Sequence, residues 1–238
     1  MSRVSVTFVT AALLCLTGAN LSATQSVDQI VQKNTDAKGG LAKLQAVQTI
    51  KQTATLSMQG TDYLLVMYSK RPNLTRQEMT VNGQLVVSAF DGLTPWMLNP
   101  MVGPKVVVVT GPQADQIRQQ SHFDSLLMDY KAMGSTAAMN GFEMMGSRRV
   151  VHLRLTSSEG QRSDVYLDAE TYLDAKVSTQ VNQTRLDYEM SDYRDQEGIK
   201  VPFLIRTLTN GVLQSELKVQ KVEFNVKLDE ALFKVPKG

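Results

Sequence analysis

Two histidines and one cysteine are the side chains of this sequence that best suit nucleophilic or acid–base chemistry. His152 occupies a polar position in the alternating stretch "VVHLRLT", so we expect it on a solvated strand surface. The Gly-x-Ser-x-Gly elbow, the His-Glu-x-x-His helix, the Walker loop and the dinucleotide fingerprint do not occur. The sequence therefore predicts no catalytic residue, and a protein that is not an enzyme.

The acidic run "LDYEMSDYRDQEG" is the only stretch that suggests a metal ion. Its carboxylates, from Asp187 to Glu197, do not have the spacing of the twelve-residue calcium loop. We interpret the run as a solvated strand face followed by a turn. The sequence predicts neither a metal site nor a cofactor.

The first 23 residues have the features of a cleaved signal peptide. Arg3 precedes an uncharged apolar run that is too short to span a bilayer, and small residues follow it. We expect cleavage after Ala23, with cleavage after Ala19 as the alternative and a retained membrane anchor as the competing interpretation. Leu14 directly precedes Cys15, which does not fit the Leu-small-small pattern before an acylated cysteine, so Cys15 should leave with the signal.

The mature chain, residues 24–238, would then contain no cysteine, which excludes disulfides, thiol catalysis and thiolate metal sites. The formal net charge of the whole chain is +2, and no basic cluster indicates nucleic-acid binding. No second long apolar run follows the signal. We expect one soluble domain, a monomer, exported from the cytoplasm.

A short helix should open this domain, and strands should follow it. Ser26 and Gln29 are spaced as a capping box, and Gly39-Gly40 is a natural helix stop. From Ile50 onward the apolar period is two. Further strands are predicted at 63–70, 74–80, 83–90, 94–99, 104–110, 143–156, 161–169, 172–181, 183–192, 199–209 and 212–226, with a bulge or a bend near Gln220.

One helix, around residues 113–134, interrupts the strands. About eleven antiparallel strands with an N-terminal and a mid-chain helix predict a mainly β (α+β) domain. Its core would be a single strongly curved antiparallel sheet, an incomplete barrel, with the mid-chain helix as a lid over a hydrophobic cavity.

Methionine is frequent, with 12 in the chain, and this flexible side chain suits a surface that must fit variable apolar shapes, although core filling is the plainer interpretation. The stretch "YLLVMY" is apolar on both faces, as expected beside a cavity. The residues expected to line the cavity are Leu56, Met58, Leu65, Met67, Met79, Val87, Trp96, Met97, Ile117, Leu126 and Leu127.

Arg71 stands at a strand end in "KRPNLTRQEM". Pro72 biases the backbone of Arg71 towards an extended conformation, so its guanidinium should point in a defined direction. On position alone, Arg71 fits the charged tip of a hairpin.

Six motifs in order resemble the LolA family of periplasmic lipoprotein carriers and the wider group of outer-membrane lipoprotein-sorting proteins. They are "DAKGGLAKLQAVQTI", "KRPNLTRQEM", "FDGLTPWMLNP", "VYLDAETYLDAKV", "SDYRDQEGIKVPFLI" and "LDEALFKVP". Thr75 stands where the carrier has an aromatic residue.

The resemblance implies a periplasmic carrier that holds the acyl chains of lipoproteins, or lipids, in its cavity and delivers them towards the outer membrane. Its partners would be acylated cargo, an inner-membrane transporter and an outer-membrane receptor. Arg71 matches the arginine that holds the lid of the carrier closed through hydrogen bonds. The alternative is a sensor or interaction module of the same fold that binds a lipidated or peptide signal and a membrane partner.

Overall fold

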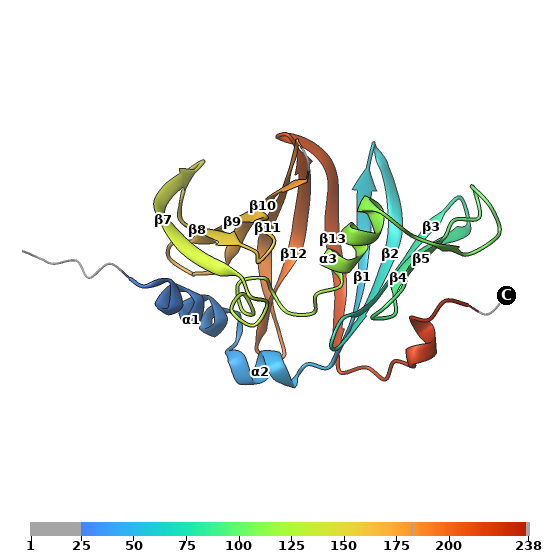
Figure 1. Ribbon diagram of the computed structural model, residues 1–238, viewed down its shortest axis with the longest axis horizontal. Helices are drawn as coiled ribbons and strands as arrows, with labels where there is room; N and C mark the ends of the chain where they lie inside the picture. The colour runs from blue at the N-terminus through green and yellow to red at the C-terminus, as the bar shows by residue number, and fades with distance from the viewer. Residues whose placement is uncertain (1–24, 182, 237–238) are drawn as a thin grey trace, which may run out of the picture.

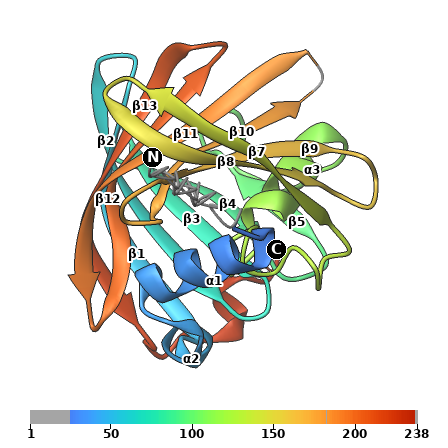
Figure 2. The same ribbon diagram turned by 90° about the vertical axis from the view of Figure 1, so that its left-hand side faces the viewer.

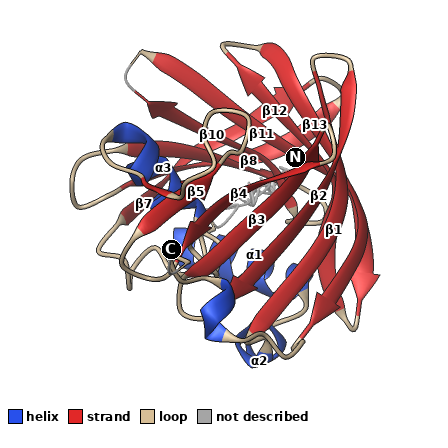
Figure 3. Ribbon diagram, turned by 90° about the vertical axis from the view of Figure 1, so that its right-hand side faces the viewer, coloured by secondary structure: helices blue, strands red, loops and turns tan. Residues whose placement is uncertain are grey.

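The computed structural model describes residues 25–181 and 183–236, which form one antiparallel sheet with a few short helices (Figures 1 and 3). The signal peptide predicted for residues 1–23 lies outside the described residues. None of the described helices is long and apolar enough to cross a membrane.

The described helices are α1 (Val27–Lys38), α2 (Leu41–Ala46), α3 (Pro112–Gln120) and a single 3₁₀ turn, η1 (Glu230–Leu232). The strands are β1 (Thr49–Met58), β2 (Thr61–Lys70), β3 (Leu74–Val81), β4 (Gln84–Phe90), β5 (Pro95–Leu98), β6 (Val107–Val108), β7 (Thr136–Met145), β8 (Arg148–Thr156), β9 (Arg162–Asp168), β10 (Asp174–Val181), β11 (Thr184–Gln196), β12 (Ile199–Thr209) and β13 (Val212–Phe224).

The sheet runs in the order β6-β5-β4-β3-β2-β1-β13-β12-β11-β10-β9-β8-β7. All consecutive strands pair with each other except β6 and β7, and the one pairing between strands that are not consecutive joins the first to the last, β1 to β13. β6 and β7 are therefore the two free edges, and the sheet curves without closing (Figure 3). The predicted curved, incomplete barrel is confirmed.

The first helix, α1, begins and ends at the residues that the sequence predicted. The Ser26 side chain accepts a hydrogen bond from the Gln29 amide while the Gln29 side chain accepts one from the Ser26 amide, which completes the predicted capping box. The helix ends at Gly39, whose φ of 129° suits glycine. A Cβ at Gly39 would also overlap the carbonyl oxygen of Gly198, so the end of α1 packs directly on the β11–β12 turn.

The predicted bulge in the last strand is also confirmed. Thr53 pairs with Lys221 and Ala54 with Val219, which leaves Gln220 as the extra residue.

Three element predictions were wrong. The single strand predicted at 143–156 is a hairpin of β7 and β8 that turns at Gly146 and begins earlier, at Thr136. The helix predicted at 113–134 stops at Gln120, and turns occupy most of the stretch beyond it. The strand predicted at 104–110 is reduced to Val107–Val108. The sheet has thirteen strands where about eleven were expected.

Candidate functional site

The helices α1 and α3 both lie on the inner, concave side of the curved sheet (Figures 1 and 2). Directly paired residues of an antiparallel sheet point to the same face, so the strand register fixes which side chains are concave. Leu56 on β1, for example, pairs with Leu217 on β13, and Leu217 pairs with Ile205 on β12. These three side chains therefore share the concave face.

A sealed core occupies the β7–β9 half of the concave side. Ile30 of α1 packs there on Val151, Leu153 and Val165, and all four are at most 1% exposed. We call this region the sealed half.

A second, smaller core lies at the other edge, where Ile117 of α3 packs on Phe90 and Val109, with Met97 against them.

Between these cores the concave side carries apolar residues that none of the helices in residues 25–181 and 183–236 covers completely. The half-buried members, which we call the central floor, come from β1, β2, β3, β11, β12 and β13. They are Leu56, Met58, Met67, Met79, Met190, Ile205 and Leu217.

Residues 109–135, which we call the crossing segment, connect the two free edges of the sheet. Because β6 and β7 lie at opposite edges, this segment has to pass from one edge to the other, and it does so on the concave side (Figure 1). Ile117 anchors its first part in the α3 core, while Leu127 and Tyr130 anchor its second part in the sealed half. The segment therefore has the position of a lid, although most of it is not helical.

Arg71 lies in the β2–β3 turn and binds two parts of the chain at once. Its Nε donates to the carbonyl of Val47 at 2.8 Å and its Nη2 to the carbonyl of Leu44 at 3.1 Å, which are carbonyls at the end of α2. The same guanidinium forms a two-pronged ion pair with Asp124 of the crossing segment. It also lies over the ring of Phe123, 4.3 Å from the ring centroid.

These contacts are partly shielded from water, since the side chains of Arg71 and Asp124 are 21% and 16% exposed. A charge-assisted, bidentate pair of this kind is stronger than a surface ion pair. The arginine therefore joins the crossing segment to α2. On the lid side its partners are a carboxylate and an aromatic ring, and on the α2 side they are backbone carbonyls.

A second carboxylate, Asp129, lies beside this ion pair. Burial raises the pKa of Asp129 above its usual value, and the neighbouring Asp124 carboxylate raises it further, against the opposing charges of Arg71 and His122. The crossing segment thus carries, next to the Arg71–Asp124 pair, an acidic group whose ionisation is less favourable than that of a free aspartate.

The predicted cavity residues divide into three groups. Six lie on the concave face of β1–β5, namely Leu56, Met58, Leu65, Met67, Met79 and Met97. Three belong to the crossing segment: Ile117 is in the α3 core, Leu127 is in the sealed half, and Leu126 is 37% exposed.

The remaining two, Val87 and Trp96, were wrongly predicted, because they lie on the opposite, convex face. They pack there against Val235 of the C-terminal segment, and the Trp96 indole donates to the carbonyl of Phe233 at 2.7 Å.

Two hollows among the described residues have volumes of about 220 and 160 Å³, and they lie beside Tyr193 and beside Lys43. Neither contains a predicted cavity residue.

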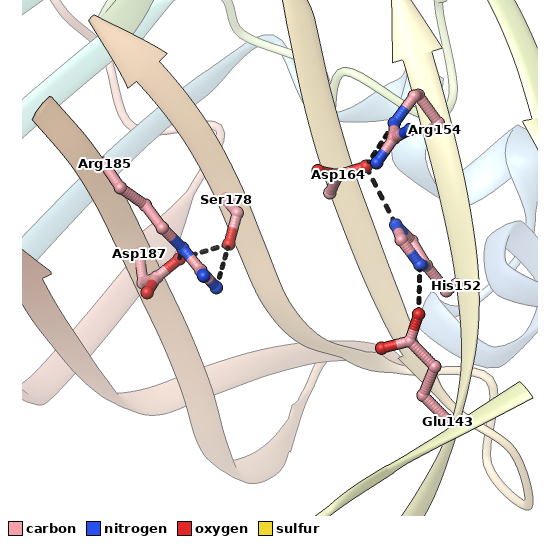
Figure 4. A network of polar contacts seen from close by, with 7 residues as sticks. All are labelled: Glu143, His152, Arg154, Asp164, Ser178, Arg185 and Asp187. Carbon is pink, nitrogen blue, oxygen red and sulfur yellow. Dashed lines mark hydrogen bonds and ion pairs between the residues drawn. The ribbon is translucent and has the colours of Figure 1, made fainter. Parts of the chain in front are cut away.

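The prediction that His152 is solvated was wrong. It is 5% exposed on the convex face, and it stacks on Tyr166 with 4.5 Å between ring centroids. Its Nδ1 lies 2.5 Å from Glu143 and its Nε2 lies 2.8 Å from Asp164, as Figure 4 shows. Both ring nitrogens of His152 therefore lie within hydrogen-bond distance of a carboxylate oxygen.

Arg154 completes this network by donating to Asp164 at 2.8 Å. Burial raises the pKa of Asp164, but hydrogen bonds from Arg154 and His152 outweigh it, so the pKa lies below its usual value. In the neighbouring cluster of Figure 4, Asp187 accepts from Ser178 and from Arg185. The network binds strands together, and the described residues contain no group of His, Cys, Asp and Glu suited to a metal ion.

Sequence reasoning missed Asp124 and Phe123, which no motif marks. It also missed three floor residues, Met190, Ile205 and Leu217, which the alternation of β11–β13 could have identified once the register was known.

No protein-family model matches this chain, and neither does any curated protein. Three solved structures resemble it over most of their length. A DUF1329 family protein from Desulfovibrio piger has a TM-score of 0.62 at 14% identity, with 89% of this chain and 98% of that chain covered. A domain from Vibrio parahaemolyticus named for outer-membrane lipoprotein sorting has a TM-score of 0.61 at 13% identity, with coverages of 87% and 97%.

The third is a LolA superfamily protein from Nitrosomonas europaea, with a TM-score of 0.59 at 12% identity and coverages of 89% and 98%. Identities this low establish the fold and not the activity. The chain described above therefore has a LolA-like fold.

Proposed function

We propose that this protein is a carrier that binds the acyl chains of lipoproteins or lipids on its central floor, beneath the crossing segment, and delivers them towards the outer membrane. The observation that carries the proposal is the half-buried state of the floor. A patch of apolar side chains, from Met79 on β3 to Met190 on β11, faces the inside of the curved sheet, and none of the described helices seals it.

The free energy of burying acyl chains explains why such cargo needs a carrier. Burial of an acyl chain contributes roughly 0.8 kcal/mol per methylene group, so acylated cargo does not leave a membrane for water unaided. A floor of Leu and Met side chains covers such chains without fixing their shape. Between its anchors at Ile117 and Leu127, the lid is joined to the body by the Arg71–Asp124 pair, so this stretch can open when that pair breaks while Leu127 and Tyr130 stay in the sealed half.

We place this activity in the periplasm, with residues 1–23 removed and Cys15 lost with them. An inner-membrane transporter would load the carrier and an outer-membrane receptor would unload it. The intact mass of the purified protein tests the first part: we expect a chain beginning near Thr24, and a diacylglyceryl adduct on Cys15 contradicts it.

Binding is tested with an apolar fluorescent probe and the mature protein. We expect micromolar affinity and displacement of the probe by an acylated lipoprotein peptide, but not by the same peptide without its acyl chains. Equal displacement by both peptides would show that acyl recognition is not the activity. Mass spectrometry of lipids that co-purify with the protein identifies the natural cargo.

A further inference from the structure

One row of concave side chains contains more polar groups than the rest of the floor. Register places Gln52 of β1, Gln77 of β3 and Ser88 of β4 in the same row, with Met67 and Met97 interleaved. All three polar side chains are half-buried. The hydrogen bonds found among the described residues include none from these three side chains. Amides in such a position are available to a ligand.

The charge of the surrounding face limits which chemical groups of a ligand can bind to these side chains. Alternation sends the charged residues of β1–β3, such as Lys51, Arg76 and Glu78, to the convex face. The concave positions of β1–β5 carry no Asp, Glu, Lys or Arg. A face without charge disfavours a phosphate or a free carboxylate, because either group would lose its hydration without gaining a partner ion. Neutral carbonyl and hydroxyl groups fit the amides instead.

The spacing also fits a ligand with a polar head and an apolar tail. Neighbouring strands lie roughly 4.8 Å apart, so Gln52 and Gln77 are about 10 Å apart across Met67. The polar row borders the central floor directly, since Leu65 and Met79 lie in the next concave row. A head group bound at the polar row therefore leaves its chain over apolar side chains.

We propose that Gln52, Gln77 and Ser88 form a polar anchor for the uncharged ester or amide carbonyls to which acyl chains are attached. This inference rests on the proposed function and adds the class of ligand: neutral acyl esters and acyl amides, in preference to alkyl ethers and to free fatty acids. The amide of glutamine donates to the ligand carbonyl, and its own carbonyl accepts from an adjacent hydroxyl or amide group.

The experiment compares two lipids of matched chain length, palmitoylglycerol and its ether analogue hexadecylglycerol, which lacks the carbonyl. Affinities are measured by displacement of the apolar probe from the mature protein. We expect the ester to bind about fivefold more tightly than the ether, which is the effect of a net amide–carbonyl hydrogen bond. Palmitate anion should bind more weakly than the ester.

The variants are Gln52→Met, Gln77→Met and the double variant, each of similar volume to the wild type. We expect the double variant to bind ester and ether equally and to keep its affinity for the probe. Gln45→Met is the matched control, because Gln45 is exposed on α2 and its loss should leave the ester preference intact. Circular dichroism and thermal unfolding check that every variant is folded.

The outcomes separate the two proposals. A protein that binds the probe but shows no ester preference, or that keeps this preference in the double variant, overturns the polar anchor alone. Loss of the preference in Gln45→Met also overturns it. A protein that binds neither the probe nor the lipids overturns the proposed function and the anchor together.

Discussion

The sealed half and the central floor are built from different alternating strands of one sheet, and both lie on its concave side. In the sealed half, α1 presses Ile30 onto side chains that are at most 1% exposed, whereas Leu56 and its neighbours in the floor stay half-buried. The difference lies in what covers them: a helix fixed by a capping box in one case, and a segment joined to the body by an arginine in the other. Apolar surface that is left partly uncovered in an otherwise well-packed sheet indicates binding and not stability.

The largest effect should come from the sealed half. Ile30→Ala removes a fully buried side chain and leaves a cavity, so we expect the free energy of unfolding to fall by about 2–5 kcal/mol and Tm by roughly 5–15 °C. Chemical and thermal unfolding measure both. The matched change in the floor, Leu56→Ala, should cost less than about 1.5 kcal/mol; equal losses at the two sites would remove the distinction between the two regions.

The Arg71 site should give the next largest effect. Arg71→Leu removes the ion pair and two hydrogen bonds to α2, and we expect a loss of about 2 kcal/mol with faster hydrogen exchange in residues 121–135. Asp124→Asn removes only the charge on the lid side, so it should speed exchange in the same residues at a smaller cost in stability. Arg71→Lys should be intermediate, since an ammonium group cannot reproduce the fork.

Transfer of an acylated peptide to liposomes gives the functional readout for these three variants. We expect Arg71→Leu to change transfer far more than it changes Tm. Unchanged transfer in Arg71→Leu would return this residue to the role of a charged hairpin tip.

A smaller effect, on the affinity for the apolar probe, should distinguish substitutions on the concave face from those on the convex face. Leu56→Ala on the concave face should lower the affinity for the apolar probe about fivefold, in line with the removal of buried apolar surface. Val87→Ala, on the convex face, should lower stability and leave probe affinity unchanged. Reduced probe binding in the Val87 variant would show that the probe does not bind the floor.

The smallest effect should be the pH dependence of Asp129. Its pKa is raised in the folded protein, so its neutral form is favoured there, and ionisation weakens the folded state as pH rises through the raised pKa. Asp129→Asn should therefore be slightly more stable than the wild type at pH 7. The difference should vanish well below pH 3.8, where this carboxyl is protonated in the unfolded chain as well. Unfolding curves of both proteins across this range measure it, and a constant difference at every pH would exclude titration of Asp129 as the cause.

Strong local patterns made much of the fold predictable. The capping box at Ser26, the glycine stop at Gly39 and the alternation from Ile50 all act within a few residues, and each was found from the sequence. The β7–β8 hairpin was missed because β7 has small residues and a register shift near Gly141, which blur its alternation.

The candidate site was less predictable, since it depends on contacts between distant segments. Arg71 was found, but Asp124 lies 53 positions further along the chain, in a stretch without a motif. Val87 and Trp96 look like cavity residues by type, and only the register shows that they face the C-terminal segment. His152 reads as a surface residue until Glu143, Asp164 and Tyr166 are placed around it.

The pairing of β1 with β13 has a consequence for how the newly synthesised chain folds. Ile50 pairs with Phe224, so the contact that joins the two halves of the sheet links residues from nearly opposite ends of the described chain. Every other strand pair closes as a local hairpin, whereas this one has to wait until the last strand has been synthesised. Loop closure over such a separation is slow. Until it occurs, β1 presents an open edge, which is the part of the newly made polypeptide most exposed to aggregation.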